Sequence, residues 1–140
     1  MTEGGGDAPL RISVSYDLLG IPGVAMQVRG FLDRCGIADR TKNRAEVAIE
    51  EVLTNVIRHG RAAPGARAIE VEVRCTDGGV HLRVIDDGIA FDPRTAPAFD
   101  PSTPLEQRTA GGMGIHLLRS FARELRYVRD GDRNRFDVIL

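Results

Sequence analysis

Lysine is nearly absent from this sequence, because Lys42 is the only one and every other basic residue is an arginine. No Gly-Lys-Ser or Gly-Lys-Thr tripeptide occurs, so a P-loop phosphate site is excluded. An excess of one charge is missing too, since 19 basic and 20 acidic side chains leave a net charge of −1. That balance gives no overall field that would favour nucleic acid or a membrane. A phosphate ligand would have to bind arginine, backbone amides or a metal ion.

Long apolar runs and closely spaced cysteines are missing as well. No stretch approaches the length of a transmembrane helix, and the start, MTEGGGDAP, lacks the basic and apolar regions of a signal peptide. Cys35 and Cys75 form no C-x-x-C and are expected to be reduced, buried thiols. These features predict a cytoplasmic protein with a flexible tail over residues 1–9 and a single domain over residues 10–140.

The spacing of apolar residues predicts the order of helices and strands. Alternation predicts strands, and spacing by three and four residues predicts helices. The expected order is a strand, two helices, a hairpin, a long loop, a helix and a second hairpin. These elements cover residues 10–17, about 21–35, about 40–59, 66–86, 87–114, about 114–123 and 124–140, with GDRN (131–134) as the last turn. This order predicts an α/β sandwich of the α+β type, a mostly antiparallel sheet with helices on one face.

The second predicted helix contains the segment EVAIEEVLTNVIRHG, which carries a polar line along its flank. Its apolar residues share one face, while Glu51, Asn55 and His59 follow one another at i, i+4 and i+8 beside that face. Asparagine is a mediocre helix residue because its amide competes for backbone hydrogen bonds. Something must therefore satisfy or use the amide. By itself the line fits either the wall of a cleft or the solvated rim of a packed helix.

Two further segments combine glycine with features that suit a ligand. In VIDDGIAFDP an apolar strand ends at Asp86, a carboxylate that can accept a hydrogen bond from a ligand amine, and Gly88 lets a ligand ring approach the backbone. A simple Asp-Gly turn is the alternative. In GGMGIHLL, Gly112 and Gly114 precede an apolar helix whose free amides suit phosphate. A flexible joint is the alternative there.

Taken together, in this order, the three segments resemble the Bergerat-fold (GHKL) ATPase superfamily, and within it the bacterial anti-sigma factors that are also serine-protein kinases. EEVLTNVIRHG is similar to the Asn-containing box of that family, and DDGIAFDP to its D-x-G-x-G-F box. GGMGIHLLRSFARELRY and NRFDVIL are similar to the second glycine box and the last strand. The resemblance covers about residues 10–140 and implies the Bergerat ATP-binding fold.

The resemblance also implies a role for each matching residue. Asn55 would coordinate a Mg²⁺ ion that bridges the ATP phosphates, and Glu51 would be the general base for the attacking serine hydroxyl. Asp86 would accept a hydrogen bond from the adenine amine, and Gly88 would let adenine lie against the backbone. The segment from Asp92 to Ala110 would be the ATP lid. The other residues expected at the nucleotide are Ala90, Phe91, Gly112, Met113 and Gly114. Arg108 is the candidate γ-phosphate contact of the lid, and a solvated lid arginine is the alternative there.

Ala90 is the one departure from the family pattern, because the box normally has a second glycine there. Alanine adds only a methyl group, but it would be strained at a positive φ. The nucleotide geometry therefore depends on the backbone angle that this residue adopts.

The function implied is an ATP-dependent serine/threonine-protein kinase that is also an anti-sigma factor. Its partners would be a sigma factor and a small STAS-type anti-sigma-factor antagonist, which it would phosphorylate, and a homodimer is compatible with the resemblance. The alternative is a nucleotide-responsive binding module with little or no kinase activity, although such a module needs no base like Glu51. The catalytic domain of a sensor histidine kinase fits less well, because the sequence has no helical dimerisation segment with a phospho-accepting histidine.

Overall fold

The computed structural model describes residues 8–60, 68–77, 79–95, 102 and 112–140, without the side chains of 60 and 112–114. Residues 1–7 of the predicted tail (1–9), Arg108 and most of the predicted lid lie outside the described residues. The expected order of elements is confirmed. The elements are β1 (Leu10–Val14), η1 (Leu18–Gly20), α1 (Ile21–Arg34), α2 (Asp39–Gly60), β2 (Ile69–Thr76), β3 (Gly79–Asp86), η2 (Pro93–Thr95), α3 (Gly112–Phe121), β4 (Glu124–Asp130) and β5 (Arg133–Ile139).

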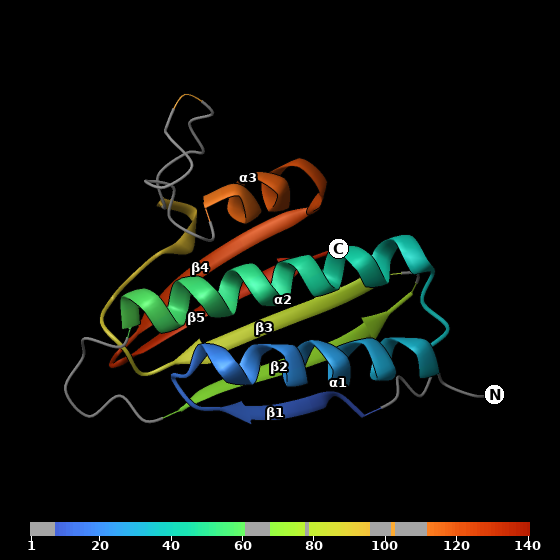
Figure 1. The fold of residues 1–140 in the computed structure, drawn as a ribbon, viewed down its shortest axis with the longest axis horizontal. Coiled ribbons are helices and arrows are strands. Elements are labelled where there is room, and N and C mark those ends of the chain that lie inside the picture. Colours follow the sequence, from blue (N-terminus) through green and yellow to red (C-terminus); the bar gives the residue numbers. More distant parts are fainter. Residues whose placement is uncertain (1–7, 61–67, 78, 96–101, 103–111) are drawn as a thin grey trace.

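The strands form one five-stranded sheet in the order β1-β2-β3-β5-β4, and every pair of neighbours is antiparallel. The helices α1, α2 and α3 lie on the same side of this sheet (Figure 1). The opposite face carries charged side chains, among them the ion pairs Arg11–Glu72 at 3.3 Å and Arg83–Asp137 at 2.7 Å. The predicted α+β sandwich with helices on one face is therefore confirmed.

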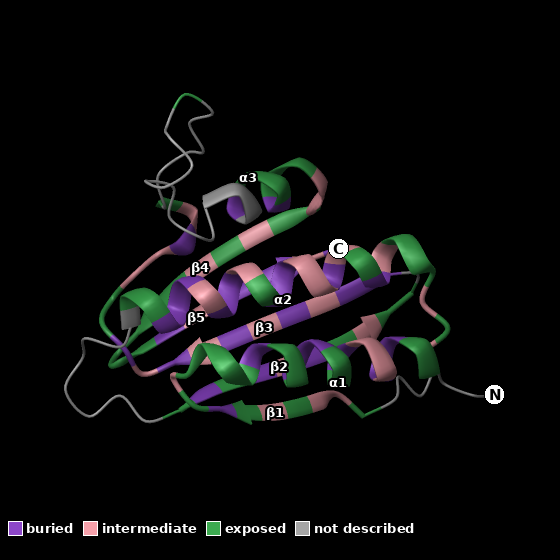
Figure 2. Cartoon of the chain, viewed as in Figure 1, coloured by how far each residue is buried: buried purple, intermediate pink, exposed green. Residues whose placement is uncertain are grey.

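The hydrophobic core lies between the sheet and the helices, where Figure 2 shows the buried residues. In β3 the burial alternates because Val80, Leu82 and Val84 point toward the helices. The predicted apolar face of α2 is confirmed, since all of its members are buried. They are Ala45, Ala48, Ile49, Val52, Leu53 and Val56. At 22 residues α2 is about 33 Å long, so one helix spans the sheet and brings its last turns to the end where β3 finishes (Figure 1).

The turn of the last hairpin is shorter than predicted. Asp130 pairs with Arg133, so the turn contains only Gly131 and Asp132, and Gly131 has a φ of 59° that suits a two-residue turn. The predicted turn over residues 131–134 is wrong at its second half. As a result Asn134 belongs to β5, where it lies opposite Asp86 of β3.

The first strand is also shorter than predicted and leaves the sheet after Val14. The chain turns at Asp17, whose amide donates to Ser15 O at 2.8 Å and whose side chain caps η1 by accepting from Leu19 N at 3.0 Å. This turn carries Tyr16 out of the sheet and toward the end of β3.

Candidate functional site

The polar flank of α2 is more deeply buried than its sequence suggests. The line Glu51, Asn55, His59 was expected to border the core, yet Asn55 is only 5% exposed and Glu51 is half-buried. The Asn55 Nδ2 and Glu51 Oε2 atoms are buried and have no hydrogen-bond partner among the described residues. Buried polar atoms without partners are rare in folded proteins and call for an explanation.

The environment of Glu51 changes its acidity. Burial raises the pKa of the Glu51 carboxyl, and the neighbouring Glu50 carboxylate raises it further, while Arg58 lowers it. A carboxylate whose pKa is raised holds a proton more strongly once it accepts one. This property suits a group that receives a proton during a reaction.

His59, the third member of the line, lies against the segment that follows β3. Its ring stacks on that of Phe91, with the ring centroids 4.1 Å apart and the planes 19° from parallel. The residue is exposed, as the alternative of a solvated helix rim allows, but the stack was not foreseen. It joins the last turn of α2 to the box that begins at Asp86.

Asp86 ends β3 and is 4% exposed. Its Oδ1 atom accepts hydrogen bonds from Asn134 Nδ2 at 3.0 Å and from the Gly88 amide at 2.9 Å. The Tyr16 hydroxyl lies 3.4 Å from the same atom and donates to Asp87 Oδ1 at 2.9 Å. Burial raises the pKa of Asp86, although the bonds from Asn134 and Gly88 lower it. No described residue donates to Oδ2, so that oxygen can accept from a ligand.

The backbone between Asp86 and Phe91 is unstrained. No non-glycine residue in the described part of the chain has a positive φ, so the strain considered for Ala90 does not arise. Ala90 is exposed, whereas Gly88 is buried beside Asp86. The Gly88 carbonyl accepts from Arg129 Nη1 of β4 at 2.9 Å. The missing second glycine therefore leaves the box in an ordinary conformation.

Asn134, Tyr16 and Arg129 are the residues that sequence reasoning missed at this end. Asn134 was placed in a turn, although it alternates in phase with Phe136 and Val138, which are buried on the helix-facing side. Extending that alternation by two residues would have put Asn134 beside the core. No sequence signal marks Tyr16 or Arg129, because each reaches the box from a different strand or turn.

The helix α3 begins at the glycine-rich segment. Gly112 is its first residue, and the first amides of any helix lack intrahelical partners. Ile115 and Leu118 are buried, and Arg44 of α2 lies over the Phe121 ring at 5.3 Å. The start of α3, the end of α2 and the end of β3 lie toward the same end of the molecule (Figure 1). The elements that carry the three predicted boxes thus meet there, while the side chains of 112–114 and the whole of Arg108 lie outside the described residues.

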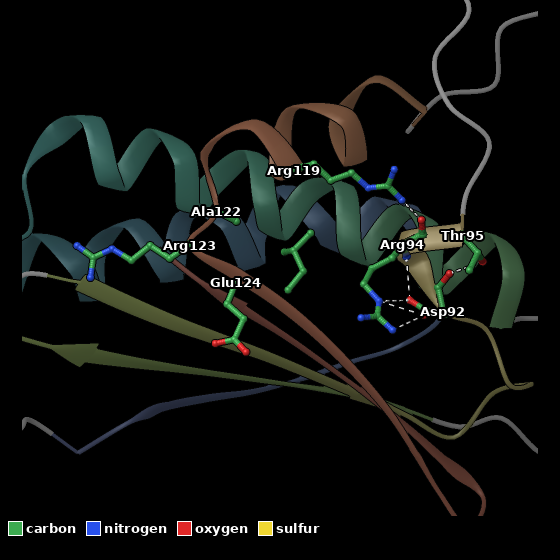
Figure 3. A pocket seen from close by; sticks show the side chains of 8 residues that line it. Asp92, Arg94, Thr95, Arg119, Ala122, Arg123 and Glu124 are labelled. Atoms are coloured by element: carbon green, nitrogen blue, oxygen red, sulfur yellow. Dashed lines mark hydrogen bonds and ion pairs between the residues drawn. The ribbon is translucent and has the colours of Figure 1, made fainter.

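A cavity of about 530 Å³ lies nearby, between η2, the end of α3 and the start of β4 (Figure 3). Its lining includes the start of the predicted lid, at Asp92, Arg94 and Thr95, but none of the residues predicted to contact the nucleotide. The Arg94 guanidinium is bound to Asp92, with Nη2 to Oδ2 at 2.7 Å, and Arg119 donates to the Arg94 carbonyl. These contacts hold η2 against α3.

A magnesium ion would find few protein ligands here. The described residues include no group of three or more histidine, cysteine or acidic side chains that could hold a metal. Mg²⁺ in nucleotide sites usually keeps several waters and binds substrate phosphates plus one or two protein oxygens. A single carboxamide oxygen, that of Asn55, fits that pattern. The Nδ2 atom of the same amide is a donor and cannot bind a metal, but it is buried and has no hydrogen-bond partner among the described residues. Nowhere in the described part of the chain is there a helix whose length and apolarity would let it cross a membrane.

Comparison with known proteins supports the same reading of the fold. Residues 16–140 match the model of a family described as the histidine kinase-like ATPase domain. The serine/threonine-protein kinase BtrW of Bordetella bronchiseptica is 29% identical over 103 residues, which cover 71% of this chain and 72% of BtrW. The serine-protein kinase RsbW of Listeria monocytogenes is 23% identical over 109 residues, covering 75% of this chain and 69% of RsbW.

A solved structure shares the fold. It contains the RsbU and RsbW domains of a Mycobacterium tuberculosis protein and superposes with a TM-score of 0.67 at 20% identity. The match covers 95% of this chain but only 32% of that one. At this identity the likeness concerns the fold alone.

Proposed function

Since the chain belongs to the histidine kinase-like ATPase domain family, we propose that it is an ATP-dependent serine/threonine-protein kinase that also acts as an anti-sigma factor. Residues 10–140 form the ATP-binding domain. Its phosphorylation substrate is a small STAS-type antagonist, and its second partner is a sigma factor. Relatives that carry the names BtrW and RsbW are serine or serine/threonine kinases, which supports this assignment.

The observation that carries the proposal is a pair of unsatisfied polar groups on one flank of α2. Glu51 Oε2 and Asn55 Nδ2 are buried without partners among the described residues. A site for a base and a metal-bound phosphate explains both groups at once. Glu51 gains its partner when the substrate hydroxyl binds, and Asn55 Nδ2 can donate to a phosphate oxygen while Asn55 Oδ1 holds the metal. A pure binding module would explain the amide but would leave the carboxylate unexplained.

In the proposed site the base of ATP lies at Asp86 and the phosphates lie along α2. Asp86 Oδ2 accepts from the adenine amine, Gly88 gives the ring access to the backbone, and Ala90 and Phe91 border it. Backbone amides of Gly112, Met113 and Gly114 at the start of α3 bind phosphate oxygens. Arg108 contacts the γ-phosphate. When bound, Mg²⁺ neutralises phosphate charge, and Asn55 would hold it.

The proposed transfer needs one proton acceptor. Glu51 takes the proton of the substrate serine hydroxyl while the serine oxygen bonds to the γ-phosphorus and the bond from that phosphorus to the ADP oxygen breaks. The products are phosphoserine and ADP, with the proton on Glu51. The raised pKa of Glu51 suits this role, because a stronger base gives a larger driving force for proton transfer.

The second candidate is a nucleotide-responsive binding module that switches partners without phosphorylating them. The experiment that separates the two is incubation of the whole chain with γ-labelled ATP, Mg²⁺ and STAS-type proteins from its own cell. Label on a serine or threonine of one of them is the result expected. If ATP binds but no such protein is labelled, the kinase proposal fails and the binding module replaces it.

A further inference from the structure

Asn134 is the most fully hydrogen-bonded side chain at the base-binding end. It is 4% exposed and lies in the middle of four contacts. Its Nδ2 donates to Asp86 Oδ1 at 3.0 Å and to the Ile89 carbonyl at 2.7 Å. Its Oδ1 accepts from the Phe91 amide at 3.4 Å and from the Tyr127 hydroxyl. An asparagine amide offers two donors and two acceptor positions, so its whole capacity is used.

These partners leave only one orientation for the amide. Its nitrogen faces two acceptors, a carboxylate and a carbonyl, while its oxygen faces two donors. Turning the amide over would set its oxygen against the Asp86 carboxylate and its nitrogen against the Phe91 amide. The orientation of Asn134 therefore follows from its neighbours.

We infer that Asn134 is a positioning residue that fixes Asp86 so that only its Oδ2 atom faces the base. This inference rests on the proposed function, since it concerns the same ATP site. Asn134 binds the box at three points, the Asp86 side chain and the backbone at Ile89 and Phe91. Together with the Gly88 amide and the Tyr16 hydroxyl, it occupies Oδ1 and leaves Oδ2 as the acceptor for the ligand. By holding the backbone it also fixes where a ring can lie.

The chemical consequence is a preference for a base with an amine at position 6. A carboxylate oxygen accepts from the amine of adenine but opposes the carbonyl oxygen that hypoxanthine or guanine carries at that position. Sites built around such a hydrogen bond reject analogues that lack the donor, because the buried polar group is then left unpaired. Asp86 makes the contact that distinguishes the two kinds of base, and Asn134 determines how large the difference in affinity is.

The test compares ATP with ITP, which replaces that amine by a carbonyl. The affinities of the whole chain for Mg–ATP and Mg–ITP are measured by calorimetric or competition titration. Asn134→Asp keeps the size of the side chain but sets a carboxylate against Asp86. Asn43→Asp is the matched control, because Asn43 is an exposed residue of α2 that accepts from Arg29 at 3.0 Å, far from the box.

We expect Asn134→Asp to lower the affinity for ATP at least about tenfold and to change the affinity for ITP much less, so that the ratio of the two collapses. A purely structural role would lower both affinities by the same factor and leave the ratio unchanged, which overturns the inference. The control should keep the wild-type ratio.

Tyr127→Phe decides the matter if Asn134→Asp does not fold. It removes only the hydroxyl that donates to Asn134 Oδ1, so we expect the same change of ratio, smaller in size. An unchanged ratio in Tyr127→Phe would then overturn the inference. A wild-type chain that binds neither nucleotide refutes the proposed function itself, whereas a wild type that prefers ATP, with variants that keep this preference, refutes only the role of Asn134.

Discussion

The two ends of the candidate site differ in how their buried polar groups are satisfied. At the base end, Asp86 and Asn134 are bound to one another and to surrounding backbone and hydroxyl groups. On the flank of α2, Glu51 Oε2 and Asn55 Nδ2 have no partner among the described residues. Both ends are buried beside the same core, so burial alone does not cause the difference.

Under the proposed function, this contrast would separate recognition from chemistry. The hydrogen bonds at the base end are already made, so that end would bind a ligand without rearranging. The flank of α2 keeps polar groups unsatisfied, at a cost of about 1–3 kcal/mol for each buried group. Such a cost is typical of positions where function and stability conflict.

The largest effect is expected when the polar flank of α2 is disabled and the base end is left intact. In Glu51→Gln we expect phosphoryl transfer to fall roughly 10²–10⁴-fold, the usual worth of a general base, while the affinity for Mg–ATP stays within about twofold. A transfer assay and a binding titration measure the two effects. Glu124→Gln, which changes an exposed glutamate of β4, should leave both unchanged. Transfer by Glu51→Gln at the wild-type rate would remove Glu51 from the reaction.

The converse change disables the base end. Asp86→Ala removes a charge-assisted hydrogen bond, worth about 1.5–3 kcal/mol, so the affinity for ATP should fall by about 10- to 150-fold. Calorimetric titration measures the loss, and circular dichroism checks that the variant is folded. Asp132→Ala, in the exposed turn of the last hairpin, serves as the control. An unchanged affinity for ATP in folded Asp86→Ala contradicts the adenine assignment.

In the absence of nucleotide, replacing a polar side chain by leucine should change the free energy of unfolding in opposite directions at the two ends. Asn55→Leu replaces an amide that lacks a partner by an apolar group of similar size, and we expect it to stabilise the chain by about 1 kcal/mol. Binding of Mg–ATP and phosphoryl transfer should both weaken in this variant. Asn134→Leu leaves the donors and acceptors around it without hydrogen-bond partners and should destabilise the chain by about 2 kcal/mol. Denaturant unfolding measures both, and the idea fails if Asn55→Leu is the less stable of the two.

The smallest expected effect concerns pH. Glu51 must be deprotonated to act as a base, and burial raises its pKa. The transfer rate at saturating ATP should therefore fall on the acidic side at a higher pH than an ordinary glutamate would give. The pKa of Asp86 is also raised, so the affinity for ATP should weaken as pH falls through that raised value. A rate profile at saturating ATP that keeps its acidic limb in Glu51→Gln contradicts the assignment to Glu51.

The architecture could be predicted from the sequence because its signals are periodic and local. The apolar face of α2 and the alternation in β2 and β3 predict both layers. Hairpin geometry was less certain, because GDRN suits a turn of two or of four residues equally well. Because of this ambiguity, Asn134 was predicted to lie in the turn and not in β5. Its hydrogen bond to Asp86 was therefore not foreseen.

The site itself was only partly accessible to sequence reasoning. Glu51 and Asn55 could be placed together because four residues make about one helical turn. The stack of His59 on Phe91 and the reach of Tyr16 to Asp87 depend on how separate elements pack. No local pattern encodes such contacts, since each joins residues that are far apart along the chain.

The pairing of β3 with β5 also has a consequence for how the protein folds. Asp86 and Asn134 are separated by 48 positions, and β5 joins the last hairpin to β3. Closing so long a loop is a slow, late kind of event compared with forming a helix or a local hairpin. A folding intermediate without the last hairpin would leave Asp86 unanchored and would bind ATP poorly. Nucleotide would then stabilise only chains in which the last hairpin has docked on β3.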